Sequence, residues 1–98
     1  MRAVRVLRFS GPMEGRDALL TLARRAGIDA EEIPGRTRPD ECWIEFAIPA
    51  AASTDVEPVA RSWERAVTRL GTGYRLREYL TEVRRASTGE LDHEASDG

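Results

Sequence analysis

The sequence follows one local plan twice, and this repetition constrains the fold more than any other feature. Each copy has a short run of alternating apolar residues, a loop rich in Gly or Ser, and an amphipathic helix that stops at a glycine. The first copy leads from Val4–Phe9 to Gly27, and the second leads from Cys42–Ile48 to Gly71. A strand followed by a helix, repeated in a chain of 98 residues, predicts one small α+β domain with helices packed on a sheet.

The two apolar runs predict strands of different kinds. Val4–Phe9 carries apolar residues on both faces, which is typical of a strand inside a sheet. Cys42–Ile48 alternates strictly, and this predicts one face covered by helices and a second face that is more polar. The expected covered face holds Cys42, Ile44, Phe46 and Ile48; the other holds Trp43, Glu45 and Ala47.

The two helices have recognisable ends. Gly27 is expected to adopt the left-handed conformation that closes a helix, and the second helix is expected to end at Gly71. Thr54 followed by Glu57 fits a capping box at the start of the second helix. The apolar residues of that helix recur at helical spacing, and Trp63 among them is expected in the core.

Two further segments are less regular. Ala30–Ile33 predicts a short strand, because Pro34 and Gly35 interrupt it. Tyr74–Arg85 fits either a helix or a strand. We predict a strand, since a sheet of two or three strands would leave apolar surface of the two helices uncovered.

The resulting order is strand, helix, short strand, strand, helix, strand. This order resembles the split βαβ plan of ferredoxin-like domains. The resemblance implies a four-stranded antiparallel sheet with two helices on one face, and with Val4–Phe9 and Cys42–Ile48 as the central strands. The domain is expected to span residues 1–86, and residues 87–98 are polar enough to predict a disordered tail.

Composition argues against several classes of function. One cysteine, Cys42, and one histidine, His93, cannot form a disulfide, a Cys–His catalytic pair or the usual metal cage, so no metal or cofactor is expected. No apolar stretch approaches the ~20 residues that cross a bilayer. Arg5 and Arg8 interrupt the N-terminal apolar run, which excludes a signal peptide there, and we expect a cytoplasmic protein without a membrane partner.

All fifteen basic residues are arginine, and the chain has no lysine, asparagine or glutamine. We interpret this as the mark of a GC-rich bacterial genome rather than of phosphate binding, because the net charge is −2. The segment Trp43–Phe46 is similar to the third strand of RNA-recognition motifs. Asp40 and Glu41 stand where such motifs need a basic residue and glycine, so no nucleic-acid partner is expected.

The first candidate site is the loop after the first strand. Gly11 and Gly15 would let backbone N–H groups approach a ligand, with Met13 and Arg16 beside them at a helix start. From Leu7 to Ile28 the chain resembles the opening of ACT-type amino-acid-sensing domains, which implies a small-molecule ligand at this loop. An ordinary connecting loop is the alternative.

The second candidate site is the exposed face of the sheet. By alternation, Trp43 and Glu45 share this face, and Arg75, Arg77 and Tyr79 are expected to join them. An aromatic patch on an open sheet predicts a homodimer interface. Arg75 and Arg77 are also placed to bind a carboxylate or an acidic protein partner, although exposed surface charge is the simpler interpretation.

These observations favour a non-enzymatic module that binds a small ligand or another protein. The alternative is a small cofactor-free enzyme. Ferredoxin-like proteins that pair face to face, of the dimeric α/β-barrel type, include monooxygenases and cyclases, and this resemblance would make Glu45 the acid or base in a cavity between two copies. A surface Glu45 paired with an arginine across the sheet is the competing interpretation.

Overall fold

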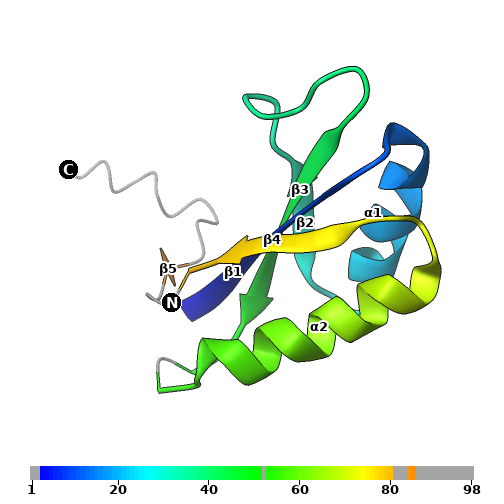
Figure 1. Ribbon diagram of the computed structural model, residues 1–98. Coiled ribbons are helices and arrows are strands. Elements are labelled where there is room, and N and C mark those ends of the chain that lie inside the picture. Colours follow the sequence, from blue (N-terminus) through cyan, green and yellow to red (C-terminus); the bar gives the residue numbers. More distant parts are fainter. Residues whose placement is uncertain (1–2, 52, 81–83, 86–98) are drawn as a thin grey trace.

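The computed structural model describes residues 3–51, 53–80 and 84–85. They form an α+β structure with a four-stranded antiparallel open sheet and two helices (Figure 1). The sheet order is β2-β3-β1-β4, so the two most apolar strands are central, as predicted. The elements are β1 (Ala3–Gly11), the 3₁₀ turn η1 (Met13–Gly15), α1 (Arg16–Arg25), β2 (Asp29–Glu32), β3 (Cys42–Pro49), α2 (Val56–Leu70), β4 (Arg75–Tyr79) and β5 (Arg84–Arg85).

The ambiguous segment after α2 contains a strand rather than a helix. Arg75–Tyr79 pairs with β1 as β4, and Arg84–Arg85 pairs with β1 beyond it as β5. The prediction of a fourth strand is therefore confirmed for these residues. The predicted polar tail at 87–98 lies outside the described residues. Within the described ranges, neither helix is long and apolar enough to cross a bilayer.

The core lies between the helices and one face of the sheet, which we call the helix face. Leu7 and Phe9 of β1 share this face with the even-numbered residues of β3. Phe46 lies at the centre: its ring centroid is 5.2 Å from that of Phe9 and 5.5 Å from that of Trp63 on α2. Trp63 packs against the core, as expected. The opposite face of the sheet, which carries Arg8, Trp43 and Glu45, is called the open face.

The helix ends follow the predicted glycines. At the end of α1, the Ile28 N–H donates to the Ala23 carbonyl at 3.0 Å while Gly27 has a φ of 76°. Gly71 closes α2 with a φ of 69°. Both features belong to the left-handed closure of a helix, in which glycine avoids the Cβ clash.

The predicted capping box is wrong. α2 begins at Val56 with Asp55 as its N-cap, and the cap side chain makes no hydrogen bond to the helix. Thr54 lies one residue further out, where its carbonyl accepts a hydrogen bond from the Arg5 guanidinium of β1. This contact with the sheet holds Thr54 outside the helix, so its hydroxyl does not cap the first turn.

Candidate functional site

A depression at one end of the open face has a volume of about 780 Å³. Its floor comes from the sheet, one wall from the β2–β3 loop, and the other wall from the segment that enters β4. Four arginines line it, and we call it the arginine groove. The lining residues are Ser10, Gly11, Pro12, Gly35, Arg36, Arg38, Asp40, Glu41, Trp43, Gly73, Arg75 and Arg77.

The β2–β3 loop is held against the sheet by its own hydrogen bonds. The Thr37 hydroxyl donates to the Ile33 carbonyl at 3.0 Å and accepts from the Trp43 N–H at 3.3 Å. Arg38 and Glu41 exchange backbone hydrogen bonds of 2.7 and 3.1 Å across the turn. This bonding gives the wall a defined shape, because the backbone polar groups of the loop have partners.

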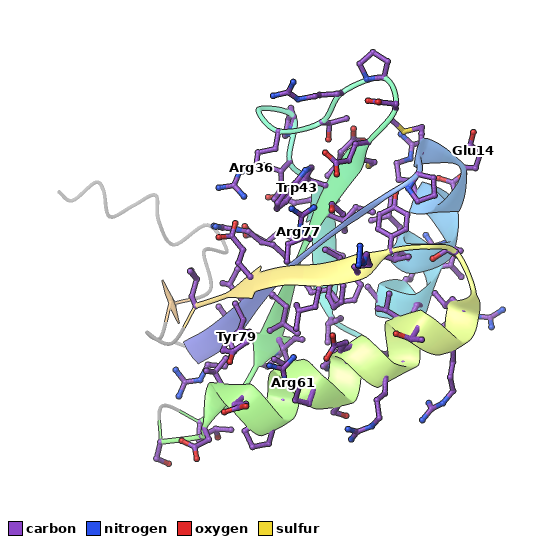
Figure 2. The ribbon with its side chains drawn as sticks, in the orientation of Figure 1. Glu14, Arg36, Trp43, Arg61, Arg77 and Tyr79 are labelled. Atoms are coloured by element: carbon purple, nitrogen blue, oxygen red, sulfur yellow. The ribbon has the colours of Figure 1, made fainter. Side chains whose placement is uncertain are left out.

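Trp43 forms the aromatic floor of the groove, and two guanidinium groups lie over its ring. The Arg36 Cζ is 4.7 Å from the ring centroid, and the Arg77 Cζ is 5.1 Å from it. Figure 2 shows the three side chains together on one side of β4. Such contacts place a cation against the negative face of an aromatic ring. Trp43 therefore presents a surface that guanidinium groups already partly cover.

Carboxylates fix the orientation of these two arginines. Arg36 donates to Glu78, and Arg77 Nη1 lies 3.5 Å from a Glu41 carboxylate oxygen. Arg77 also donates to the Ser10 hydroxyl at 2.8 Å. The Glu41 carboxylate accepts from the Trp43 indole N–H at 3.4 Å. The groove floor is consequently ordered before any ligand arrives.

Arg8 continues the charged network along the open face. Its Nε donates to Glu45 at 3.0 Å and its Nη1 lies 3.4 Å from Glu78. The hydrogen bond that Arg8 donates to Glu45 raises the pKa of Arg8, with Glu78 adding to the effect and partial burial opposing it. Glu45 is thus paired with an arginine across the sheet, as the competing interpretation of this residue expected.

The ion pairs of Glu78 predict a measurable acid sensitivity. The hydrogen bond from the Arg36 guanidinium lowers the pKa of Glu78 below its ordinary value of 4.5; burial opposes this, and the charge of Arg36 and the contacts with Arg8 add to it. A carboxylate whose pKa is lower in the folded state stabilises the fold above its unfolded pKa and loses this contribution as the pH falls through the folded pKa. We expect Glu78→Gln to flatten the fall in unfolding free energy below pH 4.5, measured by urea denaturation. An unchanged dependence of the unfolding free energy on pH below 4.5 would contradict the prediction. Glu57→Gln on α2 serves as an exposed control.

Arg38 and Arg75 differ from the other two arginines of the groove. Neither has a carboxylate oxygen within 4 Å in the described part of the chain. Both are exposed, and they belong to opposite walls. They are the two cations of the groove that are available to an anion from solution.

The structure places the predicted face residues in two groups. Trp43, Arg75 and Arg77 line the groove, and Glu45 lies on the same face beside Arg8. Tyr79 lies on the helix face, where it packs against the core beneath Arg61 (Figure 2). A bulge is the cause: Arg8 pairs with Glu78 and Phe9 with Leu76, so one extra residue of β4 shifts the alternation. The role of these residues as a dimer interface stays a prediction.

The predicted glycine loop is packed rather than hollow. A Cβ on Gly11 would lie 2.5 Å from Tyr74 Cδ1, and a Cβ on Gly15 would lie 3.0 Å from Tyr74 Cε1. Arg16 points to Glu32 and Asp17, and Met13 packs against the core. Only Gly11 of this set reaches the groove, and ligand binding by the loop stays a prediction.

Tyr74 explains why these glycines are needed. Its ring is buried, and burial raises the pKa of its hydroxyl well above the ordinary range, with the adjacent Cys42 adding to the shift. Apart from the Cys42 thiol beside it, the hydroxyl has no hydrogen-bond partner among the residues described. The ring therefore fills the space beside Gly11 and Gly15.

Sequence reasoning missed Arg36, Arg38, Glu41 and Glu78 as residues of the site. The first three belong to a loop without periodicity, and only the hairpin register brings them to the open face. In the described ranges, no group of three or more His, Cys, Asp or Glu side chains has metal-binding geometry. No family model, curated protein or solved structure matches the chain.

Proposed function

We propose that this protein is a non-enzymatic binding module whose arginine groove takes a carboxylate-bearing ligand, either a small molecule or an acidic segment of a partner. The observation that carries the proposal is the pair Arg38 and Arg75, two exposed guanidinium groups that face a common groove and have no carboxylate partner in the described structure. Guanidinium groups bind carboxylates with paired, charge-assisted hydrogen bonds.

The surroundings of the groove favour a carboxylate over a nucleic-acid strand. Asp40 and Glu41 also line the groove, and their repulsion grows with the number of negative charges that a ligand brings, so a strand of closely spaced phosphates is penalised more than a single carboxylate. Arg36 and Arg77 cover the ring of Trp43, so a base would have to displace them to stack there. The net charge of −2 adds no long-range attraction for a polyanion.

The charge network also favours binding over catalysis. Arg8 donates to Glu45, so that the carboxylate proposed for an acid or base role is occupied by a structural ion pair. A general acid or base needs a free position within hydrogen-bond reach of the reacting group. The cofactor-free monooxygenase or cyclase is the less favoured function for this reason.

At the level of fold, the proposal includes a ferredoxin-like arrangement. Supporting it are the order of elements, strand–helix–strand–strand–helix–strand, and the antiparallel order β2-β3-β1-β4. A homodimer through the open face would have to bury Arg8, Glu45 and the groove ion pairs, which is costly for charged groups. A copy of this chain is therefore not the occupant we favour for the groove.

The groove is tested by titrating the protein with citrate, with a short glutamate peptide, with pyrophosphate and with an oligothymidylate. We expect citrate and the glutamate peptide to shift the Trp43 indole N–H resonance and the arginine side-chain resonances of the groove. Arg38→Ala and Arg75→Ala should each weaken this binding about tenfold, because each removes one charge-assisted contact worth roughly 1.5–3 kcal/mol.

The matched control is Arg65→Ala, which removes an exposed arginine of α2 outside the groove and should leave affinity unchanged. Binding that persists in both groove variants would overturn the proposal. So would tighter binding of the oligothymidylate than of the carboxylates. Glu45→Ala, compared in the same titration, should retain the carboxylate affinity.

A further inference from the structure

The two edges of the sheet carry opposite charges. β2 forms one edge, and its Asp29 and Glu31 are exposed with no ion-pair partner in the described structure. β4 forms the opposite edge, and its Arg75 and Arg77 are exposed. No described strand pairs with the outer side of either one. An edge strand presents a row of unpaired backbone N–H and C=O groups that can pair with another strand.

The charged residues of both edges lie on the same face of the sheet. Asp29 pairs with Ala47 and Glu31 with Glu45, which puts both acids on the open face. Arg75 pairs with Ser10, and Arg77 donates to the Ser10 hydroxyl, so both arginines also lie on the open face. The acidic side chains of one edge and the basic side chains of the other therefore lie on the same side of the sheet, where opposite charges can meet.

The direction of the strands suits a second copy placed side by side. Three antiparallel pairings separate β2 from β4, so the two edge strands run in opposite directions. A copy set beside β4 in the same orientation brings its β2 antiparallel to β4. The helices of both copies then lie on one side of a continuous sheet.

One antiparallel register matches three successive positions of the two edges. It places Asp29 opposite Arg77, Ala30 opposite Leu76 and Glu31 opposite Arg75. Ala30 and Leu76 both contact the core on the helix face, so apolar residues meet there while opposite charges meet on the open face. Cross-strand pairs of opposite charge stabilise a sheet, and like charges directly opposite destabilise it.

The same charges disfavour symmetric pairing. Two β4 strands would set Arg77 against arginine, and two β2 strands would set acids against acids. If the edge charges served only to prevent association, every pairing of two edges would be repulsive. Here the pairing of β2 with β4 is attractive. We infer that β4 of one copy binds β2 of a second copy, in an antiparallel register that pairs Asp29 with Arg77 and Glu31 with Arg75.

Such a contact is heterologous: each copy uses a different surface from its neighbour's, so it grows into rings or open chains rather than stopping at a dimer. Sedimentation velocity of the wild-type chain should show a mean mass that rises with concentration beyond the dimer and falls as salt screens the edges. A chain that stays monomeric at all accessible concentrations would overturn the inference, as would association that ends at a dimer.

A charge swap gives the decisive test. Glu31→Arg sets an arginine opposite Arg75 across the contact, and Arg75→Glu sets a glutamate opposite Glu31. Each variant alone should associate about tenfold more weakly than the wild type. An equimolar mixture should recover association, because the two altered positions then face each other with opposite charges and the two unaltered edges pair as in the wild type. Recovery also shows that both variants fold, and failure of the mixture to recover would contradict the inference.

The register is tested by mixing Glu31→Cys with Arg75→Cys under oxidising conditions. A crosslinked heterodimer is expected, since Cys42 is fully buried and does not compete. The control mixture of Glu31→Cys with Arg65→Cys should not crosslink above background, and equal yields in the two mixtures would exclude the register. Asp29 and Glu31 lie outside the arginine groove, so their variants keep all four groove arginines, and a citrate titration of the dissociated variant tests ligand binding separately from association.

Discussion

Replacing Phe46 with alanine is expected to lower the free energy of unfolding by about 3–5 kcal/mol, the usual cost of removing a large buried aromatic side chain. Phe46 is fully buried and is the residue through which the sheet contacts α2. Its ring packs against Phe9 within the sheet and meets Trp63 edge-on, at an interplanar angle of 88°. The change would leave a cavity between two layers that cannot close without moving the helix.

Urea denaturation measures this effect as a fall in the transition midpoint with little change in slope. Phe46→Leu keeps most of the volume and should cost much less than the alanine variant. Ala47→Gly on the open face of the same strand is the control for backbone effects, at roughly 0.5–1 kcal/mol. A loss for Phe46→Ala no larger than for Ala47→Gly would contradict the central role of this side chain.

The regular elements could be predicted because their signals are local. β3 alternates between buried and half-buried residues along its length, and this alternation is present in the sequence. α2 ends at Gly71, which adopts the left-handed conformation. Glycine can do so without contacts from distant residues, so this signal is local. In both cases, the residue pattern and the backbone geometry have the same period.

The positions of side chains beyond the bulge could not be predicted by alternation. Strict alternation puts Arg75, Arg77 and Tyr79 on one face, yet one extra residue opposite Arg8 sends Tyr79 to the helix face. A bulge depends on pairing with a distant strand, so β4 alone carries no sign of it. Tyr79 therefore lies away from the arginine groove, although alternation predicts it on the same face as Arg75 and Arg77.

The arginine groove was predicted only in part, for a related reason. Arg75 and Arg77 lie on a strand, so the alternation of strand residues predicts the face on which they lie. Arg36 and Arg38 lie in a loop, where no such alternation applies. Their placement in the groove depends on the hydrogen bonds of Thr37 and on the turn closed by Glu41. Such contacts have no periodic signal, and only three-dimensional structure brings the two pairs of arginines together.

Glycine in the loop after β1 shows how one residue type allows two interpretations. The sequence indicates only that a side chain is absent at Gly11, which suits either a bound ligand or a neighbouring side chain. In the structure, Tyr74 fills this space: a Cβ on Gly11 would lie 2.5 Å from the Tyr74 Cδ1 and 2.8 Å from the Tyr74 Cα. The contact with the Cα matters most, because a backbone atom cannot move aside as the end of a flexible side chain can.

Gly11→Ala is therefore expected to destabilise the fold by about 1–3 kcal/mol through overpacking. The matched control is Gly35→Ala, since a Cβ there meets nothing within 4 Å and the residue does not have a positive φ. That variant should leave stability unchanged or raise it by about 0.4–1 kcal/mol, because alanine restricts the unfolded chain. Thermal unfolding of both variants, with the near-ultraviolet circular dichroism of the tyrosines as a second probe, measures the difference. Equal midpoints would mean that Tyr74 yields to the added methyl group, and that the glycine is not required by packing.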